Sequence, residues 1–264
     1  MSARNNKANK AAARERLRQE REAQLKKDKA RRQAIVAGSI VGVLALAGGI
    51  GYLVMEMTKP DAWEKAADAP LVTPKNATGD KGTTVVVGKA DAKKTLEVYE
   101  DSRCPACAVF EQSVGGQIKT DVDAGKYKLR YVGATFIDKG VSGEGSKNAL
   151  SALGAALNVS PEAFLEYKAA LYSKANHPEE TDDKFAKDAY LIKVADGVPA
   201  LKGNADFKAA VENGTYDRWA LEMSKAFDAS GVKGTPTLMM DGKKIETPQT
   251  PEAFTAAIDA ALKG

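Results

Sequence analysis

One long run of apolar, uncharged residues extends from Ala34 to Met55. As a helix, these about 22 residues would extend about 33 Å, which is enough to cross the hydrocarbon core of a bilayer. Arg31 and Arg32 directly precede the run, and basic flanks stay in the cytoplasm. The pattern predicts one transmembrane helix over residues 34–55 that anchors the chain in the lipid bilayer, with the C-terminal part outside. The run is longer than the apolar part of a signal peptide, which favours an uncleaved anchor over a cleaved signal.

The segments on either side of this run differ in composition. Residues 1–33 hold 12 Lys and Arg against 4 Asp and Glu, whereas the whole chain has a net charge of +4. They predict a basic cytoplasmic tail, which lacks interleaved aromatic residues and adjoins the membrane segment, so nucleic acid is not an expected partner. Residues 56–81 combine Pro60, Pro70, Pro74 and Gly79 with charged residues, and this composition predicts a linker.

The folded domain is expected to cover residues 82–264. Thr83–Val87 and Thr95–Tyr99 are rich in β-branched residues and predict strands. A helix should begin at Cys104 and Pro105 and run to about Val122, because proline suits the first turn of a helix. Lys128–Phe136 predicts the next strand. A strand, a helix and a strand in this order predict a parallel crossover and therefore an α/β fold.

The pattern becomes helical from about residue 142 to residue 213. This block is too long for a simple connection, so it predicts a helical subdomain inserted into the α/β fold. Its helix candidates are residues 148–157, residues 163–172 after a Ser160-Pro161 cap, residues 181–194 and residues 205–213. The elements expected after it are a helix over 216–229, strands over 237–240 and 243–245 joined by Asp241-Gly242, and a last helix to Leu262.

The two cysteines of the chain, Cys104 and Cys107, lie at the junction of a predicted strand and a predicted helix. Unpaired N–H groups and the positive dipole end at a helix N-terminus stabilise a thiolate. Cys104 is therefore expected to be the exposed nucleophile. Cys107 lies one turn later on the same face and is expected to be the resolving thiol of a redox-active disulfide.

A second signal is the segment Gly231-Val232-Lys233-Gly234-Thr235-Pro236-Thr237, directly before a predicted strand. Small residues followed by a proline at a strand start indicate a turn proline. On local sequence alone, Thr235-Pro236 is equally compatible with an ordinary trans turn.

The order of these features resembles that of the thioredoxin superfamily, and the membrane-anchored DsbA-like thiol-disulfide oxidoreductases of bacteria in particular. Tyr99-Glu100-Asp101 before Cys104-Pro105-Ala106-Cys107 is similar to the Gram-positive and actinobacterial versions, and the resemblance covers about residues 80–264. It implies a thioredoxin-like fold with an inserted helical subdomain, preceded here by the transmembrane helix.

The resemblance also implies a site and its partners. Pro236 would be cis and lie beside Cys104, where the loop keeps metal off the thiols, and the backbone of Thr235 would pair with a substrate strand. The substrates would be reduced exported proteins, and a membrane quinone-linked partner of the DsbB or VKOR-like kind would reoxidise the dithiol. No cofactor and no metal is expected.

The chain departs from the family pattern at two positions. Residue 106 is alanine where the best-known periplasmic oxidase has histidine, so a less extreme oxidant is expected. Val98 occupies the position, six residues before the first cysteine, where many relatives have a buried acid.

Glu97 and Glu100 lie on opposite faces of the strand. Either could relay protons to Cys107, although a solvated surface glutamate is the expectation for each. Arg103 is likewise expected to be solvated.

Three alternatives to a disulfide donor fit the sequence less well. A metal-binding module is disfavoured, because zinc requires four ligands and the chain offers two cysteines and the distant His177, which is expected to be a plain loop residue. A redox-inert scaffold domain would hold Cys104 and Cys107 in a static disulfide. A reductase or isomerase would use the same dithiol in another direction. An extracytoplasmic location favours net disulfide formation, so the predicted function is disulfide donation to exported proteins.

Overall fold

The computed structural model describes residues 62–248 and 250–263, together with positions 15, 16, 18, 21, 24, 26, 27 and 29 of the basic tail. The chain divides into two compact units, Met1–Pro60 and Asp61–Gly264. The described positions of the tail are helical and exposed, and the predicted transmembrane helix over residues 34–55 lies outside the described residues. Within the described part of the chain, no helix combines the length and the apolar composition that crossing a bilayer requires.

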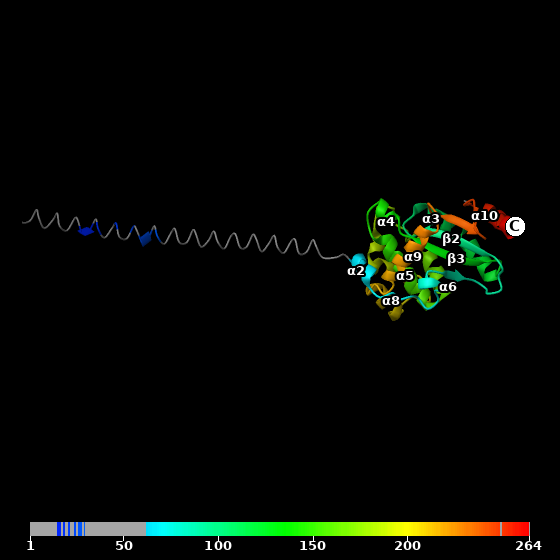
Figure 1. Ribbon diagram of the computed structural model, residues 1–264, viewed down its shortest axis with the longest axis horizontal. Helices are drawn as coiled ribbons and strands as arrows, with labels where there is room; N and C mark the ends of the chain where they lie inside the picture. Colours follow the sequence, from blue (N-terminus) through cyan, green and yellow to red (C-terminus); the bar gives the residue numbers. More distant parts are fainter. Residues whose placement is uncertain are drawn as a thin grey trace, which may run out of the picture. The chain divides into compact units, whose positions relative to one another are not determined.

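The strands of the second unit form one mixed sheet (Figure 1). Its order is β1-β3-β2-β4-β5, and β2 and β3 run parallel while each other neighbouring pair is antiparallel. The strands are β1 (Val85–Val87), β2 (Thr95–Asp101), β3 (Lys128–Ala134), β4 (Thr237–Met240) and β5 (Lys243–Ile245). The central strand β2 therefore pairs with both β3 and β4, which lie far apart in the sequence.

Helices cover both faces of this sheet. The helices of the unit are α2 (Ala62–Asp68), α3 (Pro105–Ala124), α4 (Ile137–Gly140), α5 (Gly145–Val159), α6 (Pro161–Tyr172), α7 (Asp188–Ala195), α8 (Ala205–Glu212), α9 (Asp217–Ala229) and α10 (Pro251–Lys263). Successive side chains of a strand point to opposite faces. The ring of Tyr99 contacts Phe227 of α9, with centroids 6.3 Å apart, whereas the next residue, Glu100, reaches Lys168 of α6. Thus α9 covers one face of β2, and α6 and its neighbour α3 cover the other.

The predicted order of elements is confirmed over most of the domain. Helices α5 to α8 follow β3 and form the inserted subdomain, and α5 lies beside α9 (Figure 1). The Ser160 hydroxyl caps α6 by accepting a hydrogen bond from the Ala163 N–H at 3.0 Å. The prediction of one helix over residues 181–194 is wrong. Lys187 has extended backbone angles, and it separates the 3₁₀ turn Lys184–Ala186 from α7.

The described part of the segment expected to be a linker, from Ala62 onward, is folded, and this differs from the prediction. Trp63 of α2 is buried, and the ammonium of Lys147 lies 5.1 Å from the centroid of its ring. Further along, the Asn76 side chain donates to the Leu157 carbonyl at 2.8 Å. These contacts hold the first part of the unit against the helical subdomain, which a proline-rich composition alone does not reveal.

Close contact between α5 and α9 yields a prediction about stability. A Cβ atom at Gly154 would lie 2.8 Å from the Trp219 ring, so Gly154→Ala should destabilise the domain by about 1–3 kcal/mol through overpacking. The control is Gly116→Ala in α3, where an added Cβ meets no atom within 4 Å. That variant should be stabilised by up to about 1 kcal/mol, because alanine favours a helix over glycine. Urea unfolding of both variants checks the pair, and equal effects would contradict the close contact.

Candidate active site

The dithiol lies where β2 ends and α3 begins. Cys104 is the N-cap residue of α3 with φ −70° and ψ 118°, and Pro105 is the first helical residue. The Cys104 side chain is 7% exposed, whereas Cys107 is fully buried, and both are free thiols. The predicted placement of the two cysteines at the helix N-terminus is confirmed. Both residues are buried, so the expectation of an exposed Cys104 is wrong, although Cys104 is slightly more exposed than Cys107.

Thr235 and Pro236 lie directly beside this dithiol. The Thr235–Pro236 peptide bond is cis, so the alternative of an ordinary trans turn is wrong. Cys104 Sγ lies 3.6 Å from the Thr235 carbonyl oxygen, to which the thiol donates when it is protonated. Pairing of Tyr99 in β2 with Thr237 in β4 explains this proximity. It brings the loop before β4 to the C-terminal end of β2, where α3 begins.

The surroundings of the two sulfurs separate their acidities. The pKa of Cys104 falls from 9.0 to about 6, mainly because the Cys107 thiol donates a hydrogen bond to it. The backbone N–H groups of Cys107 and Ala106 act in the same direction, whereas burial opposes the shift. Burial raises the pKa of Cys107 far above its ordinary value, and the hydrogen bond with Cys104 and the charge of Glu100 act in the same direction. At neutral pH, Cys104 is therefore a thiolate and Cys107 a thiol.

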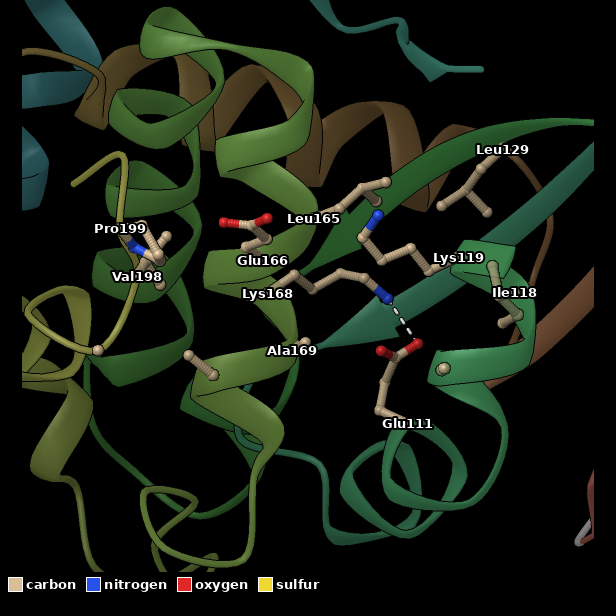
Figure 2. A pocket seen from close by; sticks show the side chains of 14 residues that line it. Glu111, Ile118, Lys119, Leu129, Leu165, Glu166, Lys168, Ala169, Val198 and Pro199 are labelled. Carbon is tan, nitrogen blue, oxygen red and sulfur yellow. Dashed lines mark hydrogen bonds and ion pairs between the residues drawn. The ribbon is translucent and has the colours of Figure 1, made fainter. Parts of the chain in front are cut away.

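A buried cluster of charges lies near Cys107 on the α3 and α6 side of the sheet. The ammonium of Lys168 is 3.0 Å from Glu100 Oε2 and 2.5 Å from Glu111 Oε1, and all three side chains are buried. Figure 2 shows the second of these contacts, at a pocket of about 320 Å³ that Lys168 and Glu111 help to line. Burial raises the pKa of Glu100 to about 8, although Lys168 opposes the shift. The expectation that Glu100 is a solvated surface residue is therefore wrong.

Glu97 lies on the other face of β2. Its Oε2 accepts a hydrogen bond from the Tyr99 hydroxyl at 2.8 Å and lies 3.1 Å from Arg130 Nη1. Its side chain is 18% exposed, so it is neither free in solvent nor directed toward the cysteines. Of the two glutamates that the sequence left open, the structure brings Glu100 to the side of Cys107.

Two further residues differ from their predictions. Arg103 is buried rather than solvated, and its Nη1 lies 2.8 Å from Asp138 Oδ1. His177 is more than a plain loop residue. Its Nε2 lies 3.1 Å from the Ser102 carbonyl oxygen, and its ring stacks on Tyr172 with centroids 5.8 Å apart. Within the described residues, no group of three or more Cys, His, Asp or Glu side chains could hold a metal ion.

Sequence reasoning missed Glu111 and Lys168, although their positions carried a signal. Glu111 lies on the same helical face of α3 as the buried Cys107 and Val114. Lys168 shares its face of α6 with the buried Phe164 and Leu171. A charged residue on an apolar helical face requires a buried partner, so these two positions predict an internal ion pair.

Comparisons with known proteins agree with this site. Residues 80–260 match the family described as thioredoxin. Disulfide bond formation protein D of Bacillus subtilis is 25% identical over 183 residues, which cover 68% of this chain and 77% of the relative. Reduced DsbA from Mycobacterium tuberculosis superimposes with a TM-score of 0.57 at 26% identity, covering 69% of this chain and 98% of that one. The thiol-disulfide oxidoreductase MdbA from Actinomyces oris superimposes with a TM-score of 0.60 at 25% identity. The match covers 71% of this chain and 92% of MdbA.

The chain belongs to the thioredoxin family. Within that family it is a DsbA-like thiol-disulfide oxidoreductase, like the relatives named above.

The acidity of Cys104 yields a prediction that needs no substrate. In the reduced protein, thiolate absorbance at 240 nm should rise with a midpoint near pH 6. Cys107→Ala removes the largest stabilising hydrogen bond, so it should move that midpoint upward toward the ordinary 9.0. Cys104→Ala is the matched control and should show no titration below pH 9, because Cys107 retains a raised pKa. An unchanged midpoint in Cys107→Ala would contradict the assigned hydrogen bond.

The raised pKa of Glu100 yields a prediction about stability and pH. Its folded pKa of about 8 exceeds the ordinary 4.5, so the folded state holds this proton more tightly than the unfolded state. The resulting stability is present below pH 4.5 and is lost as the pH rises toward 8. Between pH 6 and pH 8, wild type should lose on the order of 2 kcal/mol more than Glu100→Gln.

Urea unfolding of the reduced proteins at both pH values measures this difference. Cys104 titrates in the same range, but both proteins keep it, so its contribution cancels in the comparison. Parallel pH dependence in the two proteins would show that Glu100 is ionised throughout.

Proposed function

We propose that the protein is an extracytoplasmic enzyme that donates disulfides to reduced exported proteins. The observation that carries this proposal is the asymmetry of the dithiol, because an acidic Cys104 lies beside a fully buried Cys107 of high pKa. A thiolate of low pKa is a good leaving group, so a disulfide between the enzyme and a substrate resolves readily in favour of the oxidised substrate.

The reaction would proceed in two exchange steps. A substrate thiolate attacks Cys104 Sγ of the enzyme disulfide, the Cys104–Cys107 bond breaks, and its electron pair passes to Cys107. A second substrate thiolate then attacks the substrate sulfur of the mixed disulfide and expels Cys104 as a thiolate. Two substrate thiols are thereby oxidised to one disulfide, and the enzyme disulfide is reduced to a Cys104 thiolate and a Cys107 thiol.

Glu100 would supply the proton that Cys107 requires in the first step. Its raised pKa keeps it protonated near neutral pH, and it lies close enough for its charge to influence the pKa of Cys107. Once it has given up the proton, the carboxylate is stabilised by Lys168 at 3.0 Å. In the reverse direction, when the dithiol is reoxidised, Glu100 would accept the proton again.

Thr235 and Pro236 would hold the substrate against Cys104. The loop lies beside the Cys104 sulfur, and the Thr235 carbonyl oxygen is 3.6 Å from it. A substrate segment that pairs with the backbone of Thr235 would align its own cysteine with Cys104. Such pairing reads the backbone rather than side chains, which suits an enzyme with many substrates.

The location and the reoxidant complete the proposal. The apolar run 34–55 would anchor the protein in the membrane, with the basic tail 1–33 in the cytoplasm and the catalytic unit outside. A membrane quinone-linked partner, DsbB-like or VKOR-like, would withdraw the electrons from the Cys104–Cys107 dithiol. The name of the Bacillus subtilis relative, a disulfide bond formation protein, supports the oxidative direction.

Cysteine substitutions test the function directly. The oxidised protein should convert a reduced two-cysteine peptide to its disulfide, and Cys104→Ser should abolish this activity because the attacked sulfur is absent. Cys107→Ser lacks the thiol that can attack a mixed disulfide at Cys104, so mixed disulfides with exported proteins should accumulate and be visible on non-reducing gels. In intact cells, a membrane-impermeant maleimide should label reduced Cys104.

Three outcomes would defeat parts of the proposal. Unaltered peptide oxidation by Cys104→Ser would exclude the assigned nucleophile. Insulin reduction faster than peptide oxidation would favour a reductase or isomerase. Labelling of Cys104 only after the cells are permeabilised would exclude an extracytoplasmic site.

A further inference from the structure

Arg103, the residue directly before Cys104, reaches from the active-site turn into the helical subdomain. Its side chain is 1% exposed. Nη1 lies 2.8 Å from Asp138 Oδ1 and 3.3 Å from Asp183 Oδ1, and Nη2 donates to the Glu180 carbonyl at 2.8 Å. These partners come from α4 and from the loop between α6 and α7, so one guanidinium joins the turn before the nucleophile to two segments that follow β3.

The same two carboxylates also cap the N-terminus of α5. Asp138 accepts hydrogen bonds from the Ser146 and Lys147 N–H groups at 2.9 and 3.0 Å. Asp183 accepts from the N–H groups of residues 144 and 145 at 2.9 and 3.0 Å. N–H groups at a helix start lack partners within the helix and carry partial positive charge. The carboxylates therefore balance both the Arg103 charge and the α5 dipole, and the first turn of α5 cannot move without disturbing Arg103.

The backbone around Arg103 is shaped to admit its side chain. Gly143 has φ +141°, and a Cβ atom there would lie 2.5 Å from Arg103 Nη1 and 2.5 Å from Asp183 Oδ2. Glycine adopts this conformation at low cost. The loop before α5 thus passes closely over the guanidinium and excludes any larger side chain at this position.

A second connection binds the same turn to the same helix. The Asp101 carboxylate accepts hydrogen bonds from the Arg103 N–H at 3.0 Å, the Ile137 N–H at 3.1 Å and the Ser146 hydroxyl at 2.6 Å. The turn that ends at Cys104 is therefore attached to the subdomain by two side chains, those of Asp101 and Arg103.

We infer that Arg103 is a positioning residue for Cys104, because it fixes the active-site turn to the helical subdomain and thereby aims the backbone N–H groups of the first turn of α3 at the sulfur. The inference rests on the proposed function only for its consequence in catalysis. A buried ion network contributes little net stability compared with apolar residues of the same shape, so the benefit of this arrangement lies in geometry. Loosening the turn would move these N–H groups away from the sulfur and weaken the thiolate.

Substitutions at Arg103 test the inference through the acidity of Cys104. Arg103→Met keeps most of the length of the side chain but loses the guanidinium and its N–H donors. The midpoint of the thiolate titration at 240 nm should therefore rise by about one pH unit or more. Arg103→Lys keeps the charge but cannot span the same acceptors, and it should give a smaller upward shift. If Arg103→Met does not fold, Asp183→Asn weakens the same network at a side chain that is 28% exposed, and it should also raise the midpoint.

Glu222→Gln is the matched control for a general loss of stability. Glu222 is a buried carboxylate held by Lys81 at 2.8 Å, Lys225 at 2.8 Å and Arg218 at 3.2 Å. This variant should lower the thermal midpoint while the Cys104 titration stays at its wild-type value.

An unchanged Cys104 midpoint in Arg103→Met would overturn the inference, as would unchanged midpoints in both Arg103→Lys and Asp183→Asn. The titration requires no substrate. A wild-type protein that fails to oxidise dithiols would therefore defeat the proposed function and leave this test intact.

Discussion

The contact between the Cys104 thiol and the Thr235 carbonyl joins two segments that lie 131 residues apart. Strand β2 makes this contact possible, because it leads into the dithiol at its C-terminal end and pairs there with the start of β4. The groups that contact the dithiol gather at this C-terminal end of β2. The helix N-terminus stabilises the Cys104 thiolate, and the loop before β4 provides the backbone that faces it.

Burial gives the two sulfurs different chemistry. Cys107 lies within the domain, where desolvation favours the neutral thiol, and the charge cluster of Glu100, Lys168 and Glu111 occupies the same side of the sheet. Such a cluster is costly to bury unless each charge has partners. The cluster lies next to a thiol that must gain and lose a proton, and this role gives a physical reason for burying its charges. The Arg103 network, in turn, holds Cys104 in place.

Local sequence was sufficient for the elements that carry the dithiol. A proline after Cys104, a glycine that ends α3 and an Asp-Gly turn between β4 and β5 each act within a few residues, and the corresponding elements formed as predicted. The charged contacts were not predictable in the same way, because Glu100 and Lys168 are 68 residues apart and Arg103 and Asp138 are 35 apart. Only the fold brings such partners together, so Glu100 and Arg103 were expected in solvent when both are buried.

The central claim is that one sulfur is a thiolate and the other a buried thiol at the same pH. Alkylation of the reduced protein with iodoacetamide, with each cysteine quantified by mass spectrometry from pH 4 to pH 9, measures this most directly. The account predicts that Cys104 reacts with a half-maximal rate near pH 6, while Cys107 stays unmodified in the folded protein throughout. Comparable rates at both cysteines, or a Cys104 profile centred on the ordinary thiol value of 9.0, would contradict it.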